Sequence, residues 1–234
     1  MRVYRDRWYA VLTGDIVRST ALSESGGVSV GKLVRDAAAR MKKMLDGSVE
    51  YEVSAFRGDG WQLFVPRAEL SIRAALFMRA ALLAARKDSP THTRCAVGIG
   101  RITNRTGTSI TEWSGPAFTM SGRALDRAAS DERLTVACAD PEIGETLNVL
   151  AQLIELGAGR WSSRQAQSLC GALGGLTQKE IALHQWKGRR TQQAVQQHLR
   201  SAGWGSIQRG LEYSEALIKQ GSRLVITRNK GKTL

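Results

Sequence analysis

Cysteine is scarce in this chain of 234 residues, and its three copies, Cys95, Cys138 and Cys170, lie far apart. An odd number of widely spaced cysteines excludes a disulfide framework and the paired spacing of a structural zinc site. The three histidines do not cluster either. We therefore expect the cysteines to pack in the core and the protein to lack a Cys/His metal centre.

Long apolar runs are also absent. None approaches the roughly 20 residues that a membrane helix needs, and the basic start, Met1–Arg7, lacks the apolar region of a signal peptide. A content of 42% hydrophobic and 24% charged residues is ordinary for a globular protein with a real core. The sequence therefore predicts a cytoplasmic protein with no membrane partner.

Acidic residues are scarce only in the last third of the chain. Residues 1–157 carry 21 Lys and Arg against 18 Asp and Glu, whereas residues 158–234 carry 13 against 3. Most of the net charge of +13 therefore belongs to the C-terminal part. This distribution favours a polyanion, above all DNA, as the partner of that part.

Two aspartates stand out among the residues that are present. An apolar run ends at Asp15, as in a buried strand that delivers a carboxylate to its end, and Asp59 lies between Gly58 and Gly60 at the tip of an expected hairpin. If the strands are neighbours, both acids converge beside the backbone carbonyl of Ile16 and form an oxygen site suited to Mg²⁺ or Mn²⁺. Alternatively, Asp15 caps the next segment and Asp59 is an ordinary turn residue.

Apolar periodicity indicates alternating strands and helices in the first two thirds of the chain. The expected elements are a strand ending at Asp15, a helix at 30–45, strands at 49–56 and 61–65, a helix at 68–86, a strand at 93–102, a helix at 117–130 and a strand at 134–139. The order β-α-β-β-α-β, then α-β, predicts an α+β fold of the ferredoxin-like palm type. In such a palm we expect the helices on one face of the sheet and a partner subunit on the other.

The segment Asp-Ile-Val-Arg-Ser-Thr-Ala-Leu-Ser-Glu, which starts at Asp15, and the Gly-Asp-Gly hairpin around Asp59 resemble class III nucleotide cyclases, and more closely the SatD-like proteins. The resemblance covers roughly residues 8–137, and the 44-residue separation of the two acids agrees with it. It implies that the two acids hold a two-metal Mg²⁺ or Mn²⁺ site with a nucleoside triphosphate as ligand or substrate.

A third segment, Ser114–Leu125, extends the resemblance. Glu112, Thr119 and Arg123 fall where a cyclase has its adenine-recognising acid, its ribose-orienting Asn and its transition-state Arg. The chain departs from the cyclase pattern in having Thr119 for that Asn and Ala55 for the purine-selecting Lys. Retained metal acids with altered base and ribose contacts favour nucleotide binding over cyclisation.

The resemblance also implies a head-to-tail homodimer. Asp15 and Asp59 of one chain would then face Glu112, Thr119 and Arg123 of the other chain. Arg18 and Arg57 flank the two acids; they either contact phosphate oxygens as charge-assisted donors or are exposed without a role.

Glycines at 157 and 159 give the strongest boundary signal in the chain. We expect a cyclase-like nucleotide-binding domain at residues 1–140, a connecting helix and linker at 141–159, and a helix-turn-helix DNA-binding domain at 160–234. The first helix of the last domain is expected after an N-cap at Ser162 or Ser163.

Residues 176–183 have the form of the first helix of a helix-turn-helix, with Thr177 and Glu180 spaced as a capping box. A basic turn leads to a second helix with an apolar stripe that faces inward. The residues expected to contact DNA are Arg189, Arg190 and Arg200 at phosphates, and Thr191, Gln192, Gln193, Gln196 and Gln197 along the outer face, where Gln pairs well with adenine. The alternative is a helical hairpin whose solvated Gln face mediates dimerisation.

The end of the chain is expected to hold a helix at 207–220 and a strand at 223–228, which forms a wing or adds to a neighbouring sheet. Residues 229–234 are expected to be a mobile basic tail.

Together these features predict a DNA-binding regulator with a Mg²⁺-dependent, cyclase-like nucleotide-binding domain. Nucleotide occupancy would alter the spacing of the two DNA-reading helices in the dimer. One alternative is an active nucleotidyl cyclase, or a related palm nucleotidyltransferase, with a DNA-targeting domain, in which Arg123 stabilises the transferring phosphoryl group. Another is a palm-dimer scaffold without a ligand.

Overall fold

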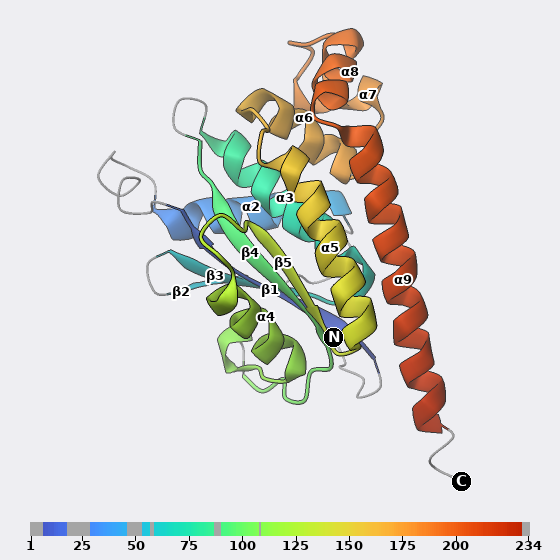
Figure 1. The fold of residues 1–234 in the computed structure, drawn as a ribbon. Helices are drawn as coiled ribbons and strands as arrows, with labels where there is room; N and C mark the ends of the chain where they lie inside the picture. Colours follow the sequence, from blue (N-terminus) through green and yellow to red (C-terminus); the bar gives the residue numbers. More distant parts are fainter. Residues whose placement is uncertain are drawn as a thin grey trace.

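A five-stranded sheet organises the first two thirds of the computed structural model, which describes residues 7–17, 29–45, 53–56, 59–86, 90–107 and 109–230 (Figure 1). The strands are β1 (Tyr9–Ile16), β2 (Val53–Phe56), β3 (Gly60–Val65), β4 (Thr93–Gly100) and β5 (Leu134–Cys138), in the spatial order β2-β3-β1-β4-β5. Neighbouring strands are antiparallel except β4 and β5. The first four strands have the ferredoxin-like order, which confirms the predicted α+β palm.

Two helices cover one face of this sheet. Helix α2 (Val30–Leu45) buries a stripe of apolar residues at helical spacing, and α3 (Ser71–Ala85), preceded by η1 (Ala68–Leu70), is buried almost all round. Alternate residues of β1, among them Leu12, belong to the same apolar cluster. This layer holds the main core of the palm.

Helix α4 (Pro116–Arg127) covers the opposite face, so the expectation that the helices lie on one face is wrong. Its residues Ala117 and Ser121 are buried over β1 and β4. Only glycine fits at position 98 of β4, because a Cβ there would collide with the backbone of Ala117 and Ser121. The close approach of α4 therefore accounts for this glycine.

The C-terminal third is helical, as Figure 1 shows. Its elements are α5 (Pro141–Ala158), α6 (Ser163–Leu173), α7 (Gln178–Glu180), the π-helical segment η3 (Ile181–Gln185), α8 (Gln192–Ser201) and α9 (Trp204–Lys230). Ser162 caps α6 in a capping box with Gln165, as one of the two expected positions. None of the described helices has the length and apolar content needed to cross a membrane.

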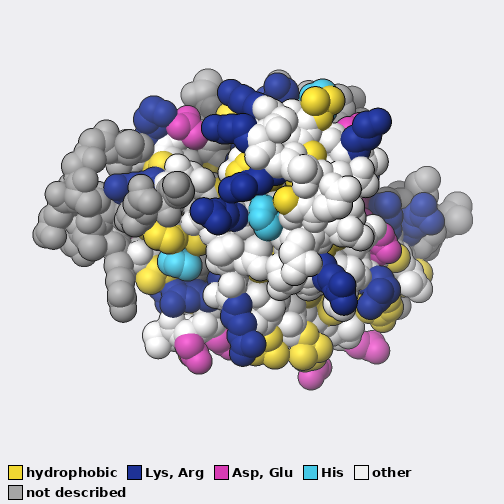
Figure 2. All heavy atoms as spheres, turned by 90° about the horizontal axis from the view of Figure 1, so that it is seen from above, with side chains coloured by type: hydrophobic (Ala, Val, Ile, Leu, Met, Phe, Trp, Pro, Cys, Tyr) yellow, Lys and Arg dark blue, Asp and Glu magenta, His cyan; other side chains and the backbone are white. Residues whose placement is uncertain are grey.

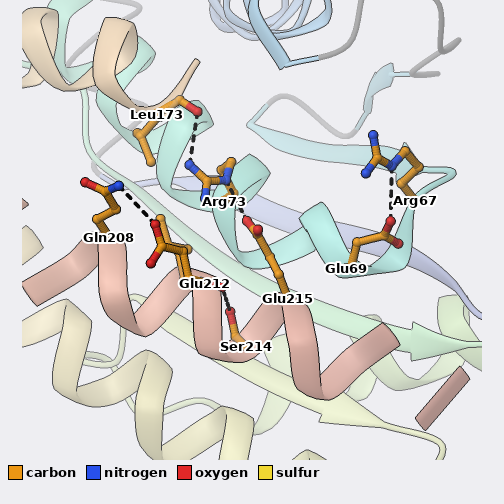
Figure 3. A network of polar contacts seen from close by, with 9 residues as sticks. Arg67, Glu69, Arg73, Leu173, Gln208, Glu212, Ser214 and Glu215 are labelled. Carbon is orange, nitrogen blue, oxygen red and sulfur yellow. Dashed lines mark hydrogen bonds and ion pairs between the residues drawn. The ribbon is translucent and has the colours of Figure 1, made fainter. Parts of the chain in front are cut away.

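The helical third shares a core with the palm. Helix α6 packs on α3, and buried residues of α6, α8 and α9 belong to the same apolar cluster as those of the sheet. Figure 3 shows Arg73 of α3, whose Nε donates to Glu215 Oε1 of α9 at 2.6 Å and whose Nη1 donates to the Leu173 carbonyl of α6 at 3.3 Å. The predicted domain boundary therefore crosses a continuous core.

Helix α9 replaces the strand expected at 223–228, so that prediction is wrong. The helix is longer than the expected 207–220 because its inward stripe, including Leu211 and Ile218, continues past Gln220. At Gly221 it lies directly against the side chains of Trp8 and Ile143. The β-branched residues after Arg223 favoured a strand, but this segment continues the helix that is packed against the palm at Gly221.

Candidate functional site

The two predicted acids converge at one end of the sheet. Asp15 is the register partner of Gly60 across β1 and β3, which places it next to Asp59 in the hairpin. The backbone N–H of Ile16 donates to the Asp59 carbonyl at 3.2 Å. The sequence therefore correctly predicted that the hairpin tip meets the end of β1.

An arginine that sequence reasoning missed lies at the same place. Arg94 is the register partner of Asp15 across β1 and β4, and its guanidinium donates to both carboxylate oxygens, with Nη2–Oδ2 at 2.5 Å and Nε–Oδ1 at 3.1 Å. The hydrogen bonds to Asp15 raise the pKa of Arg94, burial opposes them, and the charges of Asp15 and Asp59 add to the increase. Arg94 is thus paired with Asp15 and lies in the electrostatic field of Asp59.

Buried neighbours hold the end of β1 in place. The hydroxyl of Thr93 donates to the Asp15 carbonyl at 2.6 Å and accepts from the indole N–H of Trp61 at 3.0 Å. Trp61 is fully buried. The position of the Asp15 backbone is therefore fixed from beneath, while its side chain stays about a quarter exposed.

The acidic pair does not fit a resident metal ion in this arrangement. A divalent cation needs free carboxylate oxygens, and both oxygens of Asp15 are engaged by Arg94. Within the described part of the chain, no three His, Cys, Asp or Glu side chains lie together as potential ligands. The guanidinium supplies the positive charge that the resemblance assigned to metal ions.

The remaining residues that resemble cyclase site residues are exposed and do not lie beside Asp15 and Asp59. Glu112 lies in η2 (Ile110–Glu112), and Thr119 and Arg123 lie one turn apart on α4; all three are exposed. Because Ser121 of α4 faces the sheet and bonds to Thr13 at 2.8 Å, Thr119 and Arg123 are on the outer side of the helix. They do not meet the acids within one chain. The predicted Arg18 and Arg57 lie outside the described residues.

The predicted DNA-contacting residues share the outer face of α8 and the turn before it. Thr191 caps the helix by accepting from the N–H of Ala194, and Val195 and Leu199 are buried beneath. The residues that remain exposed are Arg189, Arg190, Thr191, Gln192, Gln193, Gln196, Gln197 and Arg200. The division into buried and exposed sides is the one the sequence predicted.

The preceding segment differs in detail from the expected first helix. Thr177 and Glu180 do form the predicted capping box, but α7 ends after one turn and continues as the wider π-helical η3. The chain then turns through Lys187 and Gly188, both with positive φ. This turn brings Arg189 and Arg190 beside the buried Trp186.

No protein-family model and no curated protein matches the sequence. Among solved structures, the chain is similar to an adenylyl cyclase from P. aeruginosa, at 17% identity over 58% of this chain and 79% of that one, with a TM-score of 0.42. It is also similar to a bacterial light-regulated adenylyl cyclase, at 19% identity, 56% and 75% coverage and a TM-score of 0.40. A third is the active GGEEF domain of a diguanylate cyclase from Vibrio cholerae, at 12% identity, 57% and 84% coverage and a TM-score of 0.39. At these scores nothing follows about ligands or activity, and the palm assignment rests on strand order.

Proposed function

We propose that the protein binds DNA, with α8 in the major groove as the second helix of a helix-turn-helix formed with α7 and η3. The observation that carries this proposal is the two-sided character of α8, which buries Val195 and Leu199 and exposes a row of Gln side chains. Such a helix is anchored on one side and presents groups that hydrogen-bond base edges on the other. Arg200, exposed near the C-terminal end of α8, suits a phosphate contact.

Selection from a random duplex library, followed by fluorescence anisotropy on the enriched duplex, tests this role. Gln193→Ala should weaken binding to the enriched duplex by about 1–3 kcal/mol and leave nonspecific binding nearly unchanged. Arg200→Gln should weaken binding to all duplexes and reduce the salt dependence by about one counterion. Gln220→Ala, an exposed glutamine on α9, is the matched control. Lack of enrichment, or equal losses in the control, would exclude base reading by α8.

A nucleotide is the ligand we propose for the palm, on the ground that Asp15, Asp59 and Arg94 converge at one end of the sheet. The pairing of Arg94 with Asp15 disfavours the two-metal chemistry of an active cyclase at this site. Thermal shifts with each nucleoside triphosphate, with and without Mg²⁺, test binding. Chromatography of the same mixtures with Mn²⁺ tests product formation, with Asp59→Ala as the control.

The outcomes separate the candidate roles of the palm. A product that disappears in Asp59→Ala would make this an enzyme and leave α8 as a targeting element. A nucleotide-dependent thermal shift without product supports a sensor. In that case the nucleotide should change the DNA affinity by the same factor by which DNA changes the nucleotide affinity. If neither a thermal shift nor a product is observed, the palm is a scaffold.

A homodimer completes the proposal. Thr119 and Arg123 face away from the sheet of their own chain, so they can approach Asp15 and Asp59 only in another copy. Light scattering on a size-exclusion column gives the molecular mass directly, and a monomer at working concentration would exclude a shared nucleotide site.

A further inference from the structure

A pocket of about 400 Å³ lies where the palm meets the helical third, on the opposite end of α3 from η1. Its lining includes Ala84 of α3, Arg164 and Gln167 of α6, and Trp186, Arg189 and Arg190 around the turn before α8. The volume falls within the range of small-molecule sites, about 300–1,000 Å³. No role was assigned to Arg164 or Trp186 from the sequence.

Contacts to Trp186 hold two of the arginines in the pocket wall. The Arg190 guanidinium lies over the Trp186 ring, 5.5 Å from its centroid, and Arg189 Nε donates to the Trp186 carbonyl at 3.3 Å. The indole N–H itself donates to the buried Ser168 hydroxyl at 3.1 Å. The two guanidiniums are therefore set in place before any ligand arrives, which lowers the entropic cost of binding.

The pocket has an excess of positive charge. Arg164, Arg189 and Arg190 are all exposed, and none of the ion pairs found among the described residues includes them. The charges of two of these arginines also affect the nearby His198. Burial lowers the pKa of His198 most, and the charges of Arg190 and Arg164 lower it further. Figure 2 shows Lys and Arg side chains gathered near the middle of this face and acidic side chains mainly toward its edges.

The pocket is separate from the glutamine face of α8. His198 turns toward α6, where its Nδ1 lies 3.0 Å from the Ser168 hydroxyl. At about 100° per residue, Gln193 and Gln196 point well away from that side of the helix. A duplex on the glutamine face would thus leave room for a second ligand beside α6.

We propose that this pocket binds the phosphate groups of a small phosphorylated ligand. Three guanidiniums that have no carboxylate partner within the described part of the chain provide bidentate donors that match phosphate oxygens. A ligand in this pocket contacts α3 of the palm and the turn that positions α8. Binding of the ligand would therefore control the position of α8 relative to the palm. The proposal does not depend on DNA binding or on the palm nucleotide.

Inorganic pyrophosphate is the probe for the test, with isothermal titration calorimetry as the first readout. Arg164→Gln should weaken pyrophosphate binding roughly ten-fold, the loss expected for one charge-assisted contact. Arg209→Gln removes the same charge from an exposed position of α9 outside the pocket and should have little effect. Equal losses of pyrophosphate affinity in both variants would overturn the proposal, because diffuse charge alone would explain them. The absence of saturable binding in the wild type would overturn it as well.

NMR titration of the three histidines locates the bound anion. Saturating pyrophosphate should raise the pKa of His198, because the anion offsets the repulsion from Arg190 and Arg164. It should leave the pKa of His92 unchanged, since that pKa is lowered by burial and by the charges of Arg79 and Arg133. An unchanged His198 would place the anion elsewhere and refute the site.

A short random duplex then distinguishes a free ligand from the DNA backbone as the source of phosphate. If the duplex binds without moving His198 and without displacing pyrophosphate, the pocket is a small-ligand site. If the duplex displaces pyrophosphate and changes the pKa of His198, the pocket binds a DNA phosphate, and the proposal is wrong.

Discussion

At the scale of single residues, Arg94 decides what the acidic pair at the end of β1 can do. It satisfies both oxygens of Asp15 and lies within the field of Asp59. One guanidinium cancels one of the two carboxylate charges and leaves a net charge of about −1, whereas the same two carboxylates alone would repel each other or attract a cation.

Replacing Arg94 with methionine should therefore create a metal site. We expect Mn²⁺ affinity to rise by at least about ten-fold, because two adjacent carboxylates regain free oxygens. Thermal shifts and Mn²⁺ electron paramagnetic resonance measure this change, with Arg35→Met on the exposed side of α2 as the control. If wild type and Arg94→Met bind Mn²⁺ equally, Arg94 does not exclude the metal.

The sequence pointed to Asp15 and Asp59 but not to Arg94, for a physical reason. The two acids belong to local patterns, a strand end and a Gly-Asp-Gly turn, that can be read along the chain. Arg94 reaches Asp15 only through the β1–β4 register, which neither strand specifies by itself. For the same reason, nothing in the spacing of Arg164 and Trp186 indicated a shared pocket.

At the scale of elements, α9 shows where local propensity loses to packing. The segment after Arg223 contains β-branched residues typical of strands. It nevertheless continues the helix, because the preceding turns pack against the rest of the protein. The N-cap of α6 and the capping box of α7, by contrast, were predictable because a cap depends on residues only three positions apart.

Gly221→Leu should test the docking of α9. The added side chain would collide with Trp8 and Ile143, and overpacking of this kind costs about 1–3 kcal/mol of stability. Urea unfolding followed by far-UV circular dichroism measures the loss. Gly205→Leu, at a position of the same helix with open space around it, should be close to neutral or stabilising. Similar stabilities for the two variants would mean that α9 is not docked at this point.

At the scale of the whole molecule, the continuous core predicts a single cooperative unfolding transition. Arg73→Met removes contacts to α6 and α9 and leaves the mostly buried Glu215 without its partner, which should cost about 3 kcal/mol in the single transition. Tryptophan fluorescence and far-UV circular dichroism should report the same midpoint before and after the change. Separate midpoints would favour the two independent domains expected from the glycines near residue 158.

The contact between Trp8 and α9 also has a consequence during synthesis. The N–H of Trp8 lies 3.5 Å from the hydroxyl of Ser222, 214 residues later, and its ring lies against Gly221. A nascent chain therefore carries a tryptophan that α9 does not yet cover, directly before β1, until nearly every described residue has been translated. Ribosome stalling or premature termination before α9 would release a palm with one side open, and such a product should be a preferred substrate for chaperones and proteases.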